Sequence, residues 1–476
     1  MLINLNSIRN IKTHKLDTEF LIKILIAYAL IINLLAALFP ILSSNDSYFY
    51  SVIAQHIVQS NDWINLQYAN HDWLDKPHLP FWLTAISYKI FGIKPFSYIL
   101  PGLLFHLIGV RYTYLLSKLL YDNKLLALFA SIIYLSSIRI LLSSVDVRAE
   151  AFLLGQITPA VYYLVLLSNI KNYNLSKYNT IDHDSINYKY LLLAILFTAS
   201  AIMTKGLIAF LVITSGVFGT LLYTRQFKKI FQTKYLFFVL GTIFAILPEL
   251  ISLIIQFDLH PEKLIYDNHN VSGIKFFFWD AQFGRFFANS YIKQNNHTDF
   301  AHYLFFCHTL LWAFLPWSCT LLSAIYMHYK HKINTVNTIR LNTTIDNYAI
   351  NNIFLFFQII PIFIIFSCSK FQLDYYLNIL IPFIAIFVAQ HLHQLYIKNH
   401  QDISLFFMQS LTNLIIVLVI VSLLLLLKVK LQIFLLFICV LLFIFLKLFS
   451  PFLAHLLRNY RFINLIKTRI IIYSLL

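Results

Sequence analysis

The feature that most limits what this chain can fold into is a series of apolar stretches, each long enough to cross a lipid bilayer. A helix needs about 20 apolar residues to span the hydrocarbon. Such stretches lie near residues 20–41, 96–117, 124–142, 149–168, 189–203, 206–223, 235–256, 303–326, 352–368, 375–397, 410–427 and 431–449. A shorter apolar helix, expected near 80–92, would span, re-enter or lie flat. The sequence therefore predicts an all-α polytopic membrane protein of about twelve to thirteen transmembrane helices. Because only 12% of the residues are charged and 59% are apolar, a soluble enzyme is excluded.

Lysine and arginine gather in alternate connections between these spans. The basic connections hold Arg9, Lys12, Lys15, Lys118, Lys124, Lys171, Lys177, Lys189, Arg225, Lys228, Lys229, Lys234, Lys330, Lys332, Arg340, Lys398, Arg458, Arg461, Lys467 and Arg469. Loops rich in these residues stay in the cytoplasm. The net charge of +16 is thus interpreted as a topology signal rather than as nucleic-acid binding, and both termini are predicted to be cytoplasmic.

The opposite, outer face is predicted to carry two long connections, residues 42–95 and 257–301, and most of the acidic residues. In the first connection, Asp46 precedes apolar residues that recur with a helical period from Tyr50 to Val58. This pattern predicts an amphipathic helix on the membrane surface. Asp46 is then either a functional carboxylate or an N-terminal helix cap.

Asp75 and Lys76 are followed by Pro77 and Pro80, whose rings fix the backbone. A cation and an anion on one stiff elbow suit contacts to a phosphate and to a metal or sugar. The alternative is that Lys76 only anchors the chain at the interface.

The short outer turns also carry charges. Asp146 and Arg148 lie in one turn, either as site residues or as an ion pair that closes it, and Lys205 lies in the next, as a site residue or an interface anchor. Arg285 stands among aromatic residues, which suits either phosphate binding or cation–π packing. Lys370 precedes Tyr375 and Tyr376, which an aromatic belt explains as well as a site does.

Several of these segments also resemble a known family. The run from Asp46 through IAQHIVQSNDWI to Asp75-Lys76-Pro77, and then PFWLTAISYKIFG, is similar to the first loop of the glycosyltransferase family 39 and 83 group. That group includes the aminoarabinose transferase of lipid A and the protein O-mannosyltransferases. SVDVRAEAFL, TKGLIAFLV, WDAQFGRF, HYLFF…LPWS and SK…YYLNILIPFIAIFVA follow in order, so that the resemblance covers about residues 20–400.

The resemblance implies a GT-C fold with outer-face amphipathic helices and a polyprenyl-phosphate-sugar donor. Transfer would invert the sugar carbon on the outer face of the bacterial inner membrane. By position, the resemblance implies catalytic roles for Asp46 and Asp146 and phosphate-binding roles for Lys76, Arg285 and Lys370. The residues expected to contact sugar or acceptor are Tyr50, Arg148, Lys205, Tyr375 and Tyr376.

The chain departs from the family pattern at three positions. Ser47 and Phe49 replace the usual Glu and Arg, and Gln282 stands where a metal-binding histidine is expected. Asp75 fits the family's other metal ligand, so a divalent metal is left open, with His71, His78 and His269 as alternative ligands nearby.

The interpretation is therefore a membrane glycosyltransferase whose acceptor is lipid A, another surface glycolipid or a protein hydroxyl. The rival from a different class is a lipid or sugar transporter or flippase. Residues 1–400 are predicted to form the transferase module, with the two long loops building the active site. Residues 401–476 would add C-terminal transmembrane helices and a basic cytoplasmic tail.

Overall fold

The structure is a computed structural model of residues 1–476. It describes residues 45–69, 71–169, 186–287, 300–336 and 347–397, together with scattered positions between 23 and 34. The predicted spans 410–427 and 431–449, the predicted module 401–476 and most of the predicted span 20–41 lie outside the described residues.

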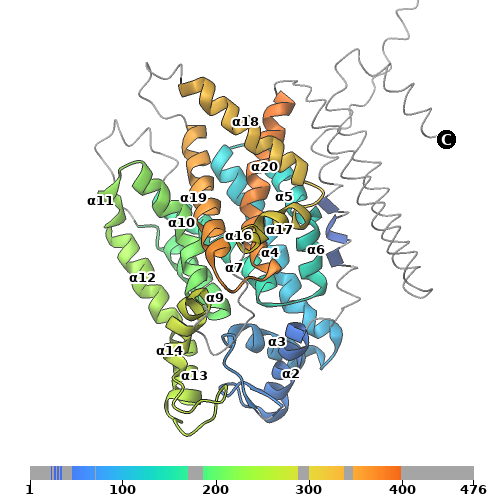
Figure 1. The fold of residues 1–476 in the computed structure, drawn as a ribbon, viewed down its shortest axis with the longest axis vertical. Coiled ribbons are helices and arrows are strands. Elements are labelled where there is room, and N and C mark those ends of the chain that lie inside the picture. The colour runs from blue at the N-terminus through green and yellow to red at the C-terminus, as the bar shows by residue number, and fades with distance from the viewer. Residues whose placement is uncertain are drawn as a thin grey trace, which may run out of the picture.

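The described chain is almost entirely helical (Figure 1). Its first part contains α2 (Asn45–Ser60), β1 (Gln67–Tyr68), β2 (His71–Asp72), α3 (Leu79–Phe91), α4 (Pro95–Tyr121), α5 (Lys124–Ser136), α6 (Ile138–Val145) and α7 (Ala149–Ser168). The middle part contains α9 (Tyr188–Lys205), α10 (Leu207–Tyr223), α11 (Phe227–Ile230), α12 (Thr233–Ala245), α13 (Leu247–Leu253), η3 (Ile254–Asp258), α14 (Gly273–Lys275), η4 (Phe276–Gly284) and α15 (Arg285–Phe287). The last part contains α16 (Phe300–Tyr303), α17 (Phe305–Ala313), α18 (Ser318–Val336), α19 (Asn347–Cys368), η5 (Asp374–Leu380) and α20 (Ile381–Ile397).

Six stretches of the described chain are long and apolar enough to cross a membrane, and two bent helix pairs would raise the number to eight. The six are Pro95–Tyr121, Ala149–Ser168, Tyr188–Lys205, Phe227–Asp258, Ala349–Cys368 and Asp374–Leu395. The predicted all-α polytopic membrane fold is thereby confirmed. The predicted span at 206–223 is the 17-residue helix α10, and the short helix expected near 80–92 is α3, which packs beside α2.

Two spans predicted as single helices are bent. The stretch 124–142 divides into α5 and α6, which meet at 63°, and the stretch 303–326 divides into α17 and α18 at 117°. Pro316 lies in the second break and has no backbone N–H to continue a helix. The two breaks are hydrogen-bonded to each other: the Ile138 N–H donates to the Leu315 carbonyl (3.0 Å), and Trp317 Nε1 donates to Ser136 Oγ (2.8 Å). Non-helical backbone is tolerated at membrane depth only when its polar groups are satisfied in this way.

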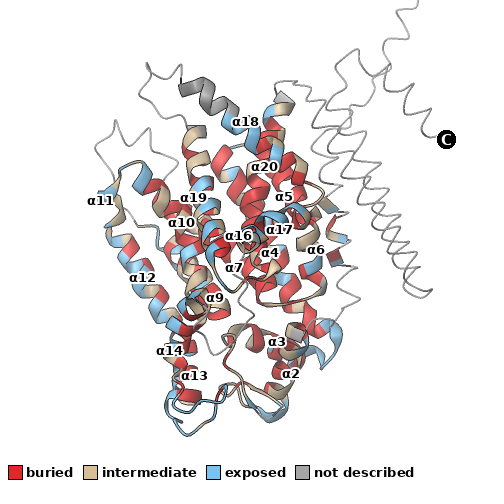
Figure 2. Ribbon diagram, viewed as in Figure 1, coloured by how far each residue is buried: buried red, intermediate tan, exposed pale blue. Residues whose placement is uncertain are grey.

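Among the six candidate spans, Ala149–Ser168 and Asp374–Leu395 are the most buried, with 83% of the apolar window buried in each, against 33% for Phe227–Asp258 (Figure 2). The apolar face of α12 is therefore free to meet lipid. The helix α7 lies directly against α4 where Gly155 faces the backbone of Phe105, an approach that a side chain at Gly155 would prevent.

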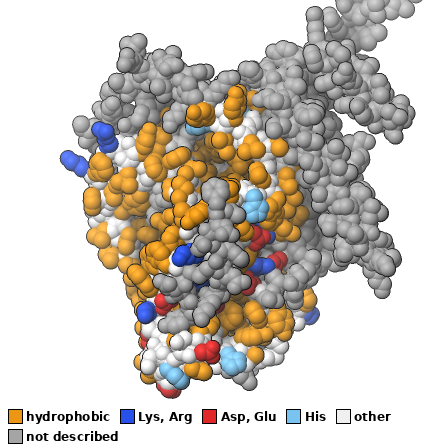
Figure 3. Space-filling model, in the orientation of Figure 1, with side chains coloured by type: hydrophobic (Ala, Val, Ile, Leu, Met, Phe, Trp, Pro, Cys, Tyr) orange, Lys and Arg blue, Asp and Glu red, His pale blue; other side chains and the backbone are white. Residues whose placement is uncertain are grey.

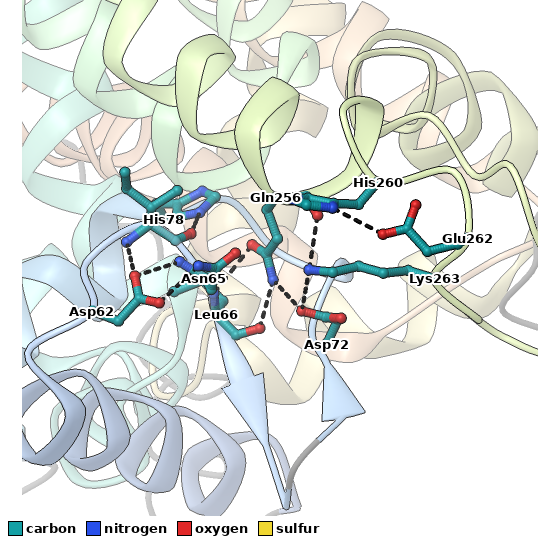
Figure 4. Close-up of polar contacts among 10 residues, drawn as sticks. Asp62, Asn65, Leu66, Asp72, His78, Gln256, His260, Glu262 and Lys263 are labelled. Carbon is teal, nitrogen blue, oxygen red and sulfur yellow. Dashed lines mark hydrogen bonds and ion pairs between the residues drawn. The ribbon is translucent and has the colours of Figure 1, made fainter.

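One end of the bundle carries residues 45–94 and 247–287, which we call the loop end (Figure 1). Here α2, α3 and a two-stranded antiparallel hairpin, β1–β2, lie beside α13 and α14. The Gln256 side chain of η3 joins the two segments: it accepts from the Leu66 N–H (3.1 Å) and donates to the Leu66 carbonyl and to Asp72 Oδ1 (both 2.9 Å; Figure 4). The two predicted long loops thus form one docked unit.

Candidate active site

The elbow at Asp75 and Lys76 meets a segment about two hundred residues further along the chain. Asp75 Oδ2 accepts a hydrogen bond from Lys76 Nζ at 2.6 Å, and Asp75 Oδ1 is ion-paired with Arg285 Nη2 at the start of α15. The Arg285 guanidinium also lies over the Phe371 ring, 5.5 Å from its centroid. The predicted cation–π packing of Arg285 is present, and the same guanidinium also binds a carboxylate.

The electrostatics of this triad favour an ionised carboxylate between two cations. Burial alone would raise the pKa of Asp75, but Lys76 and Arg285 outweigh it, and the pKa of Asp75 lies below its ordinary value. Burial lowers the pKa of Lys76. Burial also opposes the charge of Arg285, yet Asp75 raises the pKa of that guanidinium.

Arg285 has a buried donor without a partner. Its Nε is buried and has no hydrogen-bond partner among the described residues. Buried polar groups are nearly always paired, so an orphan N–H on a cavity-lining arginine requires an explanation. An anionic ligand supplies one.

A second charged group surrounds the Tyr375 ring of η5. The Tyr375 hydroxyl donates to Asp46 Oδ2 at 2.9 Å, and Asp46 lies in the first turn of α2. Arg148 Nη1 is 3.5 Å from the same Asp46 oxygen, and Arg148 Nη2 is 2.7 Å from Asp146 Oδ2. The Arg148 guanidinium lies 4.5 Å from the Tyr375 ring centroid. The predicted ion pair that closes the Asp146–Arg148 turn is present, and it also reaches Asp46.

Lys205 joins the two groups. It ends α9, and its ammonium lies 4.0 Å from the Tyr376 ring centroid and 5.6 Å from that of Tyr375. Its ion-pair partner is Glu150, a nearly fully buried carboxylate in the first turn of α7. An interface anchor would not need a buried counter-ion, so the contacts favour a place for Lys205 in the site.

A cavity of about 520 Å³ opens between these residues and the apolar helices. Its polar lining residues are Asp75, Lys76, Lys205, Glu249, Gln282, Arg285, Ser369 and Tyr376. Its walls are aliphatic and aromatic side chains of α7, α10, α13, η4, α15 and α19. Figure 3 shows charged side chains gathered over the lower part of the molecule, with hydrophobic side chains covering most of the described surface above them.

The structure thus brings together most, but not all, of the residues expected in the site. Asp75, Lys76, Lys205, Arg285 and Tyr376 line the cavity, whereas Asp46, Asp146, Arg148 and Tyr375 form the adjacent charged group. Tyr50 is buried against Phe81. Burial, followed by the charges of Asp75 and Asp46, raises the pKa of the Tyr50 phenol. Lys370 stays apart: its side chain is exposed and does not line the cavity, although its backbone N–H donates to the Phe286 carbonyl.

The residues present do not fit a divalent metal. Each Asp75 oxygen already has a cationic partner, and no group of three or more His, Cys, Asp or Glu with metal-site geometry occurs in the part of the chain that the structure describes. Gln282 instead completes the α9–α10 turn, where its Oε1 accepts from the Ile208 N–H (3.3 Å) and its Nε2 donates to the Lys205 carbonyl (3.5 Å). The turn needs glycine at position 206 because its φ is +81°, a conformation that other residues rarely adopt. A side chain there would also collide with Gln282.

The alternative histidine ligands are engaged elsewhere or exposed. His78 is buried against Glu249, His269 Nδ1 lies 3.1 Å from the Glu262 carbonyl, and His71 is exposed in β2. The two departures on α2 have different surroundings. Ser47 is buried, and Phe49 packs on Tyr68 and Trp73.

Sequence reasoning missed three residues with important contacts. Glu150 pairs with Lys205, and Glu249 pairs with His78. Arg139 of α6 pairs with Asp374 at 3.1 Å and lies 5.7 Å from the Tyr375 ring centroid. Glu150 and Glu249 could have been identified from the sequence, because each is a lone acid inside an apolar stretch.

Comparison with known proteins supports the resemblance. The sequence model of the family described as dolichyl-phosphate-mannose-protein mannosyltransferase matches residues 75–251. The undecaprenyl phosphate-alpha-4-amino-4-deoxy-L-arabinose arabinosyl transferase of Wigglesworthia glossinidia brevipalpis is 26% identical over 36% of this chain and 30% of its own length. Transferase 2 of that name from Proteus mirabilis is 25% identical over 63% of this chain and 49% of its own length.

Among solved structures, ArnT from Cupriavidus metallidurans, bound to undecaprenyl phosphate, superposes with a TM-score of 0.61. The match covers 84% of this chain and 64% of that one, at 16% identity, and it establishes a shared GT-C fold. The chain spans less than two thirds of the length of each of these three relatives. The family resemblance and the polytopic fold predicted from the sequence are thus both confirmed.

Proposed function

We propose that this chain, a multi-pass membrane protein with a GT-C fold, is a glycosyltransferase. It moves a sugar from a polyprenyl-phosphate donor to lipid A or another surface glycolipid. The names of its arabinosyl transferase relatives and the undecaprenyl phosphate bound by the solved ArnT support this assignment. The positive-inside pattern of the connections supports placing the loop end on the outer face of the bacterial inner membrane, with both termini in the cytoplasm.

The observation that carries the proposal is the composition of the cavity. Apolar side chains of several helices line the cavity together with Lys76 and Arg285, and the Nε–H of Arg285 is buried and has no partner among the described residues. A polyprenyl phosphate has the same two parts, a hydrocarbon tail and an anionic head. Arginine binds phosphate through a planar fork of donors, and lysine supplies a point charge.

In the proposed reaction, an acceptor oxygen attacks the anomeric carbon of the donor sugar while the bond from that carbon to the phosphate oxygen breaks. The bonding electrons leave with the polyprenyl phosphate, whose growing negative charge Lys76 and Arg285 stabilise. A single in-line displacement of this kind inverts the sugar carbon. Asp75 holds both cations in place and does not react.

Asp46 and its neighbours serve the acceptor side. When the acceptor is a hydroxyl group, Asp46 accepts its proton. When the acceptor is a lipid A phosphate, which is already anionic, Asp46 orients the sugar or stabilises the positive charge that develops on it. Tyr375 and Arg148 fix the Asp46 carboxylate for either task, and Asp146 holds Arg148.

The test compares the lipid A and surface glycans of a strain that lacks the protein with those of strains complemented by the wild type, Asp46→Asn or Tyr112→Phe. The control variant removes a hydroxyl that contacts Tyr163 at 2.7 Å, away from the cavity. We expect mass spectrometry to show a sugar that the wild type and Tyr112→Phe restore. Asp46→Asn should reduce transfer by a factor of about 100 or more.

Binding of undecaprenyl phosphate to the purified proteins separates chemistry from carrier recognition. Asp46→Asn should bind this lipid as the wild type does. Identical glycans with and without the protein would refute the transferase assignment. Wild-type transfer by Asp46→Asn would refute the role given to that carboxylate. A protein that moves the donor across vesicles without any sugar transfer would instead be the transporter.

A further inference from the structure

Beneath the elbow that carries Asp75 and Lys76 lies a fully buried ion pair outside the cationic centre. Glu249 of α13 accepts the backbone N–H of His78 through Oε2 (3.0 Å), and its Oε1 lies 2.9 Å from His78 Nδ1. The side chains of Glu249 and His78 are 0% and 1% exposed. One carboxylate therefore holds both the backbone and the ring of the residue that precedes α3.

The other side of the His78 ring also faces an acceptor. His78 Nε2 lies 2.9 Å from the Ile64 carbonyl oxygen. That carbonyl belongs to a turn organised by Asp62, whose Oδ1 accepts the N–H groups of Ile64 (2.9 Å) and Asn65 (3.0 Å). A neutral imidazole has one N–H, whereas an imidazolium has two. Acceptors at both nitrogens therefore favour the imidazolium.

The groups around the ring agree with this charge state. Glu249 approaches from α13, the Ile64 carbonyl from the first loop, and the uncharged Trp82 indole from α3, with ring centroids 5.3 Å apart. Burial lowers the pKa of His78, but the Glu249 carboxylate and the two hydrogen bonds outweigh it, and the pKa is raised above its ordinary value.

This pair is connected to the cationic centre through a single stiff residue. Pro77 separates His78 from Lys76, and its ring fixes the backbone between them. Lys76, Pro77 and Glu249 all line the cavity. A movement of His78 away from α13 would therefore shift the elbow that carries Asp75 and Lys76 relative to Arg285.

We propose that Glu249 and His78 are positioning residues: their buried ion pair fastens the elbow to α13 and sets the position of Lys76 against the donor phosphate. This inference rests on the proposed function, because it assigns Lys76 to the donor phosphate. Neither residue contacts the reacting atoms.

The test is Glu249→Gln in the full-length purified protein, with Glu262→Gln as the matched control. Glu262 and His260 form an exposed pair on the neighbouring loop with the same 2.9 Å separation (Figure 4). We expect Glu249→Gln to weaken binding of the probe, undecaprenyl phosphate, about tenfold and to raise the KM for the sugar donor by a similar factor. Glu262→Gln should leave both unchanged.

The pH profile gives a readout that general destabilisation does not move. A group whose pKa is raised in the folded state contributes its full stabilisation of that state below the unfolded-state pKa. This stabilisation is lost as the pH rises through the folded-state pKa. The wild type should therefore keep its affinity for undecaprenyl phosphate until the pH exceeds the raised pKa of His78. In Glu249→Gln the alkaline loss should move to lower pH, because a buried imidazole without a carboxylate is neutral.

Two further measurements cover a variant that does not fold. In the wild type, nitrogen NMR of labelled histidine, assigned with His78→Gln, should show both ring nitrogens of His78 protonated at pH 7. The double variant His78→Gln/Glu249→Gln leaves no unpaired charge and should bind the probe weakly at every pH. A neutral His78, or wild-type binding and pH dependence in both Glu249→Gln and the double variant, would overturn the inference. If the wild type neither binds undecaprenyl phosphate nor transfers sugar, the proposed function fails, while the NMR result still decides the charge of His78.

Discussion

Replacement of Arg285 by methionine isolates the contribution of the guanidinium to the proposed reaction. Methionine keeps much of the side-chain volume but removes the ion pair to Asp75 Oδ1, the 3.3 Å hydrogen bond to the Asp75 carbonyl and the unpaired Nε–H. The remaining carboxylate is not left without a counter-ion, because Lys76 Nζ stays 2.6 Å from Oδ2.

These contacts set the two magnitudes that we expect. Loss of a charged hydrogen bond costs about 1.5–3 kcal/mol of stability, which is less than the 3–5 kcal/mol or so for leaving a buried charge unpaired. Loss of one preorganised donor at a developing negative charge costs about 2.7–4 kcal/mol of transition-state stabilisation, a factor of roughly 10²–10³ in rate. Arg285→Lys keeps the positive charge but loses the planar fork of donors. Its transfer rate should therefore lie between those of the wild type and Arg285→Met, about tenfold below the wild type.

The assay is the initial rate of sugar transfer in proteoliposomes, with thermal unfolding measured on the same preparations. The matched control is Lys275→Met, which removes an exposed cation of α14 at the same end of the bundle. Arg285→Met should lose activity far beyond its loss of stability, whereas Lys275→Met should lose neither. A transfer rate for Arg285→Met within threefold of the wild type would refute the assignment of this guanidinium to the leaving phosphate.

Three further outcomes follow from the geometry. Because the Asp75 oxygens bind cations, chelation of divalent metals should leave the transfer rate within about twofold of the untreated rate; a large loss that added metal restores would contradict this arrangement. Gly155→Ala places a Cβ 2.7 Å from the Phe105 Cα and should destabilise the protein by about 1–3 kcal/mol or more in thermal unfolding. In Gly241→Ala the added Cβ meets only side-chain atoms of Ile195, with the terminal Cδ1 nearest. This substitution should therefore cost far less, and equal losses would argue against backbone crowding. Since the pKa of Asp75 is lowered in the folded state, the ionised carboxylate contributes to the free energy of unfolding above the unfolded-state pKa of about 3.9. This contribution is lost as the pH falls through the folded-state pKa. The stability difference between the wild type and Asp75→Asn should therefore stay constant from pH 7 to about pH 5; a difference that shrinks within this range would contradict the lowered pKa.

Features that depend only on a short stretch of sequence, such as membrane-spanning helices and turns, could be predicted. The length of an apolar run determines whether a helix spans a bilayer, and therefore α4, α7 and α19 follow from local sequence. Similarly, Gly206 marks a turn, and Pro77 and Pro80 mark the elbow and the first turn of α3, because of their own backbone preferences. The bend between α17 and α18 was not predicted, although Pro316 is a local signal for it.

Pairing between distant segments could not be predicted. Nothing near Lys205 indicates that Glu150 is its counter-ion, and nothing near His78 points to Glu249, 171 residues away. Resemblance placed Lys370 with the phosphate ligands, yet its side chain is exposed beside the cavity rather than part of its lining. Which residues share a site depends on how the helices cross, and that information is spread over the whole chain.

The pairing itself has a physical role in and around the candidate site. Arg139 pairs there with Asp374, Arg148 with Asp146, Lys205 with Glu150, and both Lys76 and Arg285 with Asp75. An unpaired cluster of buried cations would repel itself and cost desolvation energy whenever no ligand is bound. The acids remove that cost and fix the cations in position, yet a guanidinium with five donors and an ammonium with three keep donors free beyond one carboxylate. Under the proposed function, the donor phosphate therefore binds to cations that the acids already hold in position before the donor arrives.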